Sequence, residues 1–168
     1  MKQPIVLCVD DDATVLTSLE TIFSKAMGSA CVFEFAESGD EALEISSDLQ
    51  KEGSELSVLI SDFIMPGMRG DELLVRLHEK SPRTIKIMLT GQSDLQGVKR
   101  TINQANLYRF LEKPFNNADL VLTVRAAVQA YQQTREKAEL AAEIAALKNN
   151  VEELKQLLSK YSGLPRNN

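Results

Sequence analysis

Five short apolar runs alternate with amphipathic stretches through the first two-thirds of this 168-residue chain. The runs cover residues 5–9, 31–35, 57–60, 85–89 and 107–111, and each is short enough for a strand. The stretches between them follow a helical period over about 13–27, 39–51, 70–80, 94–104 and from 117 onward. Because regular alternation of strands and helices places helices on both faces of a parallel sheet, we predict an α/β fold with a doubly wound five-stranded parallel sheet.

Charge and composition exclude several classes of protein. Nineteen Lys and Arg against 24 Asp and Glu give a net charge of -5, which offers no general attraction for nucleic-acid phosphates. No apolar run approaches the roughly 18 residues that cross a bilayer, and three acids by residue 12 are atypical of a secretory signal. We therefore expect a cytoplasmic protein that binds neither nucleic acid nor membrane directly. Cys8 and Cys31 lack the spacing of metal ligands or redox pairs, which predicts buried thiols.

The last third of the chain has the composition of one long helix, rich in Ala, Leu, Glu, Lys and Gln. Asn116 or Asn117 can cap its start, and Gly163 marks its end. Apolar residues at 121, 124, 128 and 131 follow the 3.6-residue period of a helix packed on a sheet. We expect a domain over 1–131, a coiled-coil signalling helix over 132–162 and a disordered tail over 163–168.

Beyond residue 139 the apolar period of this helix changes to a heptad that starts at Leu140 and ends at Tyr161. β-Branched residues prevail at a, Leu occupies d, and Glu143 at g can meet Lys148 at e of a partner helix, a pattern that favours a parallel two-stranded coiled coil. An alternative is that the leucines fold back onto the domain. The residues predicted to form a homodimer are Ile144, Val151 and Leu158 at a, with Leu147 and Leu154 at d.

Polar residues follow four of the five predicted strands at the point where each strand ends. Asp10, Asp11 and Asp12 follow the first, Asp62 the third, Thr90 the fourth and Lys113-Pro114 the fifth. In an open parallel sheet these ends meet in one crevice. Two carboxylates about 5 Å apart repel by roughly 3 kcal/mol at an effective dielectric constant of 20, so such a cluster requires a cation. Oxygen ligands without His or Cys favour Mg²⁺.

The sequence resembles the receiver domain of bacterial two-component response regulators over about residues 4–130. The resemblance implies a flavodoxin-like sheet with strand order 2-1-3-4-5. It depends on four motifs at the expected strand ends: Val9-Asp10-Asp11; Ile60-Ser61-Asp62 followed by Met65-Pro66-Gly67; Leu89-Thr90-Gly91; and Phe110-Leu111-Glu112-Lys113-Pro114-Phe115.

The resemblance implies that Asp62 accepts a phosphoryl group from a histidine kinase or a phosphotransfer protein. Asp11 would bind Mg²⁺ directly, Asp10 would lie nearby through water, and Asp62 and the backbone carbonyl of Ile64 would complete the protein ligands. Lys113, aimed by a cis bond to Pro114, would pair with Asp62 and then with the phosphoryl group. Thr90 would hydrogen-bond another phosphoryl oxygen, and Gly91 would leave space beside it.

In this family, movement of the residue at Thr90 lets an aromatic side chain of the fifth strand turn inward, and that aromatic is Phe110 here. A buried core position for Phe110 is the alternative, and Tyr108 lies on the same strand face. Ile64 is apolar where many relatives carry a polar side chain, which predicts slow loss of the phosphoryl group. Asp12 is expected to face solvent or start the first helix, and His78 to lie on the surface.

Two other functions are compatible with parts of this pattern. Asp10-Asp11-Asp12-Ala13-Thr14 fits the Asp-x-Asp-x-Thr signature of haloacid dehalogenase-type phosphatases, in which Asp10 would be the nucleophile. The second alternative function is a receiver-like scaffold that binds a partner without being phosphorylated. We expect a protein that phosphorylates itself from a donor, with slow autodephosphorylation and no independent substrate turnover. An effector domain outside these 168 residues would receive the signal.

Overall fold

A computed structural model describes residues 3–91 and 95–163, with side chains given for all of these except 95–97 and 100. Five parallel strands form one sheet in the order β2-β1-β3-β4-β5, which confirms the predicted fold and strand order. The strands are β1 (Ile5–Val9), β2 (Val32–Ala36), β3 (Leu56–Asp62), β4 (Ile85–Thr90) and β5 (Arg109–Glu112).

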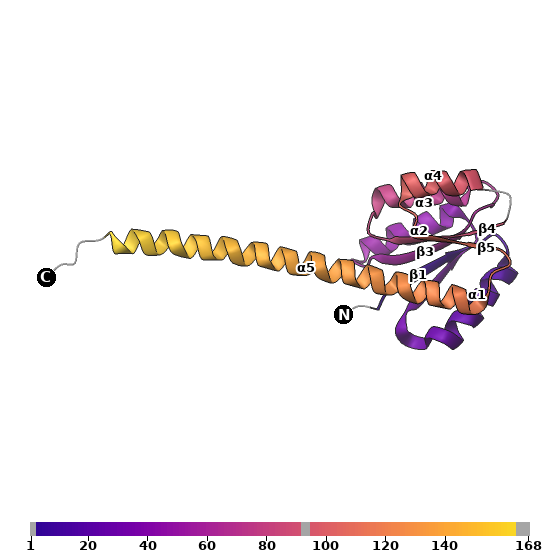
Figure 1. Cartoon of the computed structure of the whole chain (residues 1–168), viewed down its shortest axis with the longest axis horizontal. Helices are drawn as coiled ribbons and strands as arrows, with labels where there is room; N and C mark the ends of the chain where they lie inside the picture. Colours follow the sequence, from indigo (N-terminus) through magenta and orange to yellow (C-terminus); the bar gives the residue numbers. More distant parts are fainter. Residues whose placement is uncertain (1–2, 92–94, 164–168) are drawn as a thin grey trace. The chain divides into compact units, whose positions relative to one another are not determined.

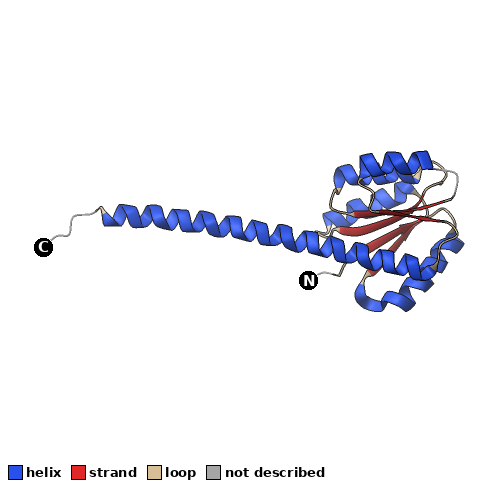
Figure 2. Ribbon diagram, viewed as in Figure 1, coloured by secondary structure: helices blue, strands red, loops and turns tan. Residues whose placement is uncertain are grey.

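Helices cover both faces of the sheet (Figures 1 and 2). On one face, α1 and the first turns of α5 pack against the strands, and on the other face lie α2, α3 and α4. The helices are α1 (Ala13–Met27), α2 (Gly39–Lys51), α3 (Gly70–Lys80), α4 (Leu95–Ala105) and α5 (Asn117–Ser162), with a short 3₁₀ helix, η1 (Gly28–Ala30), after α1.

The sheet is buried on both faces because each strand contributes alternate side chains to two hydrophobic clusters. Val58 and Ile60 of β3 join the cluster under α1 and α5, whereas Leu59 joins the one under α2, α3 and α4. All seven residues of β3 are buried, as expected for the central strand of a parallel sheet. This rigid central strand carries Asp62 at its end.

Four of the five predicted strands have boundaries that are wrong by one or two residues. The third strand covers 56–62 and not 57–60, and the fourth ends at 90 and not at 89. The second strand begins at Val32 and not at residue 31, because η1 occupies residues 28–30 and ladder pairing starts at the bond from the Val32 amide to the Pro4 carbonyl. The fifth strand begins at Arg109 and not at 107, because its register with β4 starts at the pair Ile87 and Arg109.

Capping explains where two helices begin. The Asp12 carboxylate accepts a hydrogen bond from the Thr14 amide at 2.8 Å and caps α1, which confirms the prediction for Asp12. The Asn116 side chain accepts a bond from the Ala118 amide at 2.7 Å at the start of α5. Cys8 and Cys31 are free cysteines with buried side chains, which confirms the prediction of buried thiols.

The described chain divides into two compact units, Met1–Gln132 and Gln133–Asn168, and α5 contributes residues to both. Within the first unit Leu120, Val124, Val128 and Tyr131 of α5 are buried. Within the second unit the heptad residues from Leu140 to Tyr161 are exposed. Most of the tail predicted over 163–168 lies outside the described residues. Every helix within 3–91 and 95–163 is too short or too polar to cross a bilayer.

His78 is partly exposed at the surface, but it also contacts a buried lysine. The His78 ring is half-buried, and Nδ1 lies 2.7 Å from Nζ of Lys86, a β4 residue with only 1% of its surface exposed. Lys86 also donates a bond to the Pro82 carbonyl at 3.4 Å. The sequence did not predict this contact, because a strand buried on both faces points the lysine into the protein, where it meets His78.

Candidate functional site

The loop after β1 holds two acids in different environments. Asp10 is buried, with its amide donating to the Ala36 carbonyl of the neighbouring strand at 3.2 Å and its carboxylate accepting from the Asp12 amide at 2.9 Å. Asp11 is exposed to solvent. The fixed backbone therefore holds one carboxylate inside the protein and the next at its surface.

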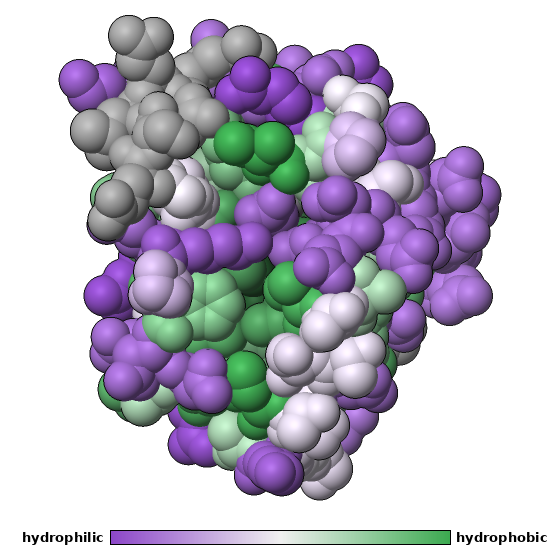
Figure 3. All heavy atoms as spheres, turned by 90° about the vertical axis from the view of Figure 1, so that its right-hand side faces the viewer, coloured by the Kyte–Doolittle hydropathy of each residue, from purple (hydrophilic) through white to green (hydrophobic). Residues whose placement is uncertain are grey.

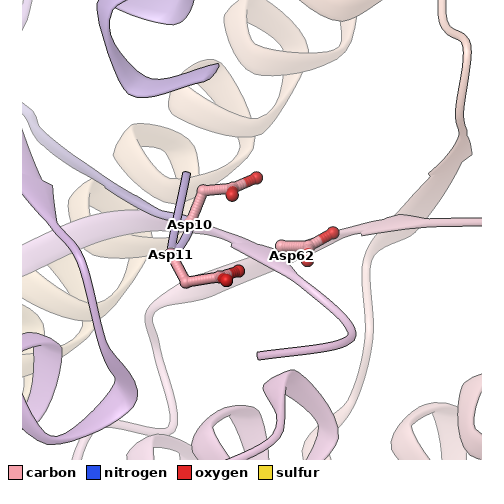
Figure 4. A group of neighbouring side chains, drawn as sticks. All are labelled: Asp10, Asp11 and Asp62. Atoms are coloured by element: carbon pink, nitrogen blue, oxygen red, sulfur yellow. The ribbon is translucent and has the colours of Figure 1, made fainter. Parts of the chain in front are cut away.

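Asp62 lies at the end of β3, where the ladder with β4 holds it in place. It pairs in register with Leu89, and the amide of the next residue, Phe63, donates to the Leu89 carbonyl at 2.9 Å. Ligand oxygens of Asp10, Asp11 and Asp62 all lie within 4.8 Å of one another. Figure 4 shows the three side chains side by side, two from the loop after β1 and one from β3. The structure thus brings together acids that are about fifty residues apart in the chain.

Lys113 reaches this acidic cluster from the end of β5. Its Nζ lies 2.8 Å from Oδ1 of Asp62 and 3.3 Å from Oδ2 of Asp10. Its amide donates to the Thr90 carbonyl at 2.7 Å, and the bond between Lys113 and Pro114 is cis, which confirms that prediction. One ammonium therefore bridges the buried carboxylate and the one at the end of β3.

Burial and charge oppose each other in this cluster. Burial raises the pKa of Asp10 above its usual range, and the Asp12 amide and the Lys113 ammonium only partly offset this. For Lys113, burial lowers the pKa, but the hydrogen bond and charge of Asp62 and the charge of Asp10 outweigh it, and the net pKa lies above the ordinary value. Three carboxylates and one ammonium leave an excess of negative charge when all are ionised. An oxygen-only donor set with that charge fits a hard divalent cation such as Mg²⁺.

Thr90 and Gly91 end the neighbouring strand. Thr90 is buried, and its hydroxyl donates to the Gly91 carbonyl at 3.0 Å. A Cβ placed on Gly91 would meet no heavy atom within 4 Å, so this glycine borders open space. Because β4 lies next to β3 in the sheet, a hydroxyl and a small residue end beside the strand that carries Asp62.

Three apolar side chains near these strand ends are exposed. Ile64 is 61% exposed. Figure 3 views the molecule from the side on which α5 begins, and hydrophobic residues are visible between hydrophilic ones on this face. Phe110 on β5 is 40% exposed, and Tyr108, which precedes the strand and is not part of it as predicted, is 44% exposed. The alternative that Phe110 is a core residue is therefore wrong, because 40% of its surface is exposed.

Gly70 is a residue of the site that the sequence did not single out. Its amide donates to the Phe63 carbonyl at 2.9 Å, and a Cβ at this position would lie 2.0 Å from the Asp62 carbonyl oxygen. No side chain fits between α3 and the end of β3 there, so glycine sets the backbone position of Asp62. The signal in the sequence was a glycine as the first residue of a predicted helix.

The chain belongs to the family of response regulator receiver domains. The family model for the response regulator receiver domain matches residues 6–125, most of the first unit. This agrees with the strand order, the acids at the ends of β1 and β3 and the lysine at the end of β5.

The curated relatives are longer than this chain. The hydrogenase transcriptional regulatory protein HoxA of Cupriavidus necator is 31% identical over 129 residues, which are 77% of this chain and 25% of HoxA. The DNA-binding transcriptional regulator NtrC of Escherichia coli is 32% identical over 136 residues, 81% of this chain and 27% of NtrC. The chain thus spans about a quarter of the length of these two relatives.

A solved structure shares the fold of the first unit. The signal receiver domain of an HD domain-containing protein from Pseudomonas fluorescens Pf-5 is 30% identical, with a TM-score of 0.69. The match covers 79% of this chain and 99% of that receiver domain.

Proposed function

We propose that this protein is a phosphoacceptor of a two-component system in which Asp62 receives a phosphoryl group from a histidine kinase or a phosphotransfer protein. The observation that carries the proposal is the position of Lys113 Nζ, 2.8 Å from a carboxylate whose oxygens lie within 4.8 Å of those of Asp10 and Asp11. A carboxylate is a weak nucleophile, so its efficiency depends on placement and on nearby charge.

Asp11, Asp10, Asp62 and the backbone carbonyl of Ile64 are the groups that we propose to hold Mg²⁺. When bound, the ion would neutralise phosphoryl oxygens and hold the attacking and leaving oxygens in line. Asp62 supplies the attacking oxygen, at the end of a strand buried on both faces. The rigid strand limits the motion of this carboxylate and favours an in-line approach.

Lys113 and Thr90 complete the proposed site. The Lys113 ammonium shields Asp62 from the charge of the other two acids before transfer and pairs with a phosphoryl oxygen afterwards. To bond another phosphoryl oxygen, Thr90 must give up the bond to the Gly91 carbonyl that it now makes. That exchange is the proposed start of the switch, and Phe110, exposed on β5 in this structure, is the side chain proposed to turn inward.

We further propose that residues 1–131 are the receiver domain and that residues 132–162 of α5 pass the change to an effector. Among the relatives, NtrC is a DNA-binding regulator, and this chain matches only a quarter of it. We therefore propose that α5 passes the signal to a downstream partner or domain, and we do not assign the activity of that effector.

Labelling by acetyl phosphate tests the phosphoacceptor proposal. Intact-mass measurement should show one added phosphoryl group on the wild-type protein with Mg²⁺ and none with a chelator. Asp62→Asn should abolish the added mass, whereas Asp12→Asn, which alters the neighbouring helix cap, should leave it. Labelling that survives in Asp62→Asn would favour Asp10 as nucleophile, as in haloacid dehalogenase-type phosphatases. A fully folded wild-type protein that no donor labels would favour the phosphorylation-independent scaffold.

A further inference from the structure

The second unit presents an apolar stripe along one side of α5. Its residues follow one another at alternating intervals of four and three, the spacing of the seam of a coiled coil. All are between 45% and 72% exposed, although most other residues of this helix segment are polar or alanine. The stripe consists of Leu140, Ile144, Leu147, Val151, Leu154, Leu158 and Tyr161.

A shallow groove runs along this stripe, and charged side chains border it. Ile144, Leu147 and Val151 line the groove together with Lys148, Glu152 and Lys155. In the heptad that puts Ile144 and Val151 at a, both lysines occupy e, and Glu143 occupies the opposite flanking position g. The two sides of the seam therefore carry unlike charge around Ile144.

We propose that the stripe is covered by a second copy of this chain in a parallel, in-register two-stranded coiled coil over residues 140–161. In a parallel pair, position g of one helix lies beside e of the other, which places Glu143 of each copy beside Lys148 of the other. β-Branched Ile144 and Val151 at a with leucines at d favour two strands over three.

Charge selects the parallel arrangement over the antiparallel one. In an antiparallel pair that keeps the apolar layers together, e lies beside e, and Lys148 of each copy meets Lys155 of the other. The parallel pair thus gains two attractions, whereas the antiparallel pair suffers two repulsions. The apolar layers fix the register, because a shift by one heptad leaves two apolar residues at each end without a partner.

Sedimentation equilibrium of the full chain tests both the partner and its orientation. The wild-type protein should reach the mass of a dimer. Lys148→Glu should weaken the parallel dimer about tenfold, because two symmetry-related pairs change from attraction to repulsion. Adding Glu143→Lys in the same chain should restore the affinity. Asn149→Glu, which adds an acid outside the seam, serves as the matched control and should change the affinity less than twofold.

The opposite results would overturn the proposal. An antiparallel dimer would become tighter in Lys148→Glu, because the introduced carboxylate of each copy would then meet Lys155 of the other. A monomer at every concentration would show that the stripe is not a dimer seam, and a trimeric mass would exclude two strands.

Cross-linking gives a second measurement of orientation. Leu140→Cys should form a disulfide-linked dimer on mild oxidation, because the two introduced thiols face each other across a parallel seam. Ala142→Cys, which lies outside the seam, should not. An antiparallel pair would separate the two introduced thiols at position 140 by about 35 Å along the coil and would prevent the link. The wild-type protein, whose Cys8 and Cys31 are buried, measures the background.

This inference goes beyond the phosphoacceptor function and is separable from it. The dimer measurements can be repeated on Asp62→Asn, which lacks the proposed nucleophile. A dimer of Asp62→Asn with no phosphoryl labelling would support both proposals, whereas a wild-type protein that is labelled but stays monomeric would overturn only this one.

Discussion

Replacing Lys86 by methionine is expected to remove a pH dependence of stability that the wild-type protein shows between about pH 8 and 10.5. Burial in β4 lowers the pKa of Lys86 from its ordinary 10.5 to about 8. Among the described residues, its Nζ has the His78 ring nitrogen at 2.7 Å and the Pro82 carbonyl at 3.4 Å as hydrogen-bond partners. Neither carries a negative charge that would stabilise the ammonium.

The sign and size follow from the two pKa values. Between pH 8 and 10.5 the unfolded chain still binds the Lys86 proton while the folded protein has released it, so the free energy of unfolding rises with pH in this window. Each pH unit corresponds to about 1.4 kcal/mol, which gives about 3 kcal/mol over the window. Below pH 8 both states carry the proton, and this stability is absent.

Urea unfolding at closely spaced pH values measures the effect as a difference between proteins. From pH 8 to 10.5 the wild-type free energy of unfolding should rise by about 3 kcal/mol relative to Lys86→Met. Groups that titrate in both the wild type and Lys86→Met cancel in this comparison. Loss of the hydrogen bonds to His78 and Pro82 changes the free energy of unfolding of the variant by an amount that is constant over the pH window. Lys80→Met, at an exposed lysine, should run parallel to the wild type. If Lys86→Met also runs parallel to the wild type, the argument from burial is refuted.

Three further predictions concern the site and its supports. Gly70→Ala places a Cβ 2.0 Å from the Asp62 carbonyl oxygen, and the forced backbone shift should cost about 1–3 kcal/mol in urea unfolding and slow labelling by acetyl phosphate. Unchanged stability and labelling would contradict that close approach. Asp12→Ala removes the acceptor for the Thr14 amide and should lower the free energy of unfolding by about 1 kcal/mol, a loss that a Ser replacement should largely spare. Ile64→Asn should hasten decay of the phosphorylated protein in a chase after donor removal, and an unchanged decay rate would disprove the role given to side-chain polarity.

The order of strands and helices was predictable because local periodicity encodes it. Five apolar runs separated by amphipathic stretches define the elements, and parallel topology then brings residues 10, 62 and 113 to one edge. The boundaries of β2 and β5 were less accurate, because pairing with neighbouring strands and the short η1 decide where each ladder begins.

Features that depend on distances between segments were not predictable. The need for glycine at position 70 arises from the approach of α3 to the Asp62 carbonyl, and sequence spacing carries no such distance. The contact between His78 and buried Lys86 likewise joins a helix to a strand. The exposure of Phe110 depends on what covers β5, which a strand pattern does not reveal.

The most direct test of the central claim is to identify the phosphorylated atom. Borohydride reduces an acyl phosphate on an aspartate side chain to the alcohol of homoserine, and peptide mass spectrometry after treatment with acetyl phosphate and Mg²⁺ then locates the converted residue. Conversion at Asp62 alone is the predicted result. Conversion at Asp10, or at a residue outside the cluster of Asp10, Asp11 and Asp62, would contradict the assignment of Asp62 as the phosphoacceptor.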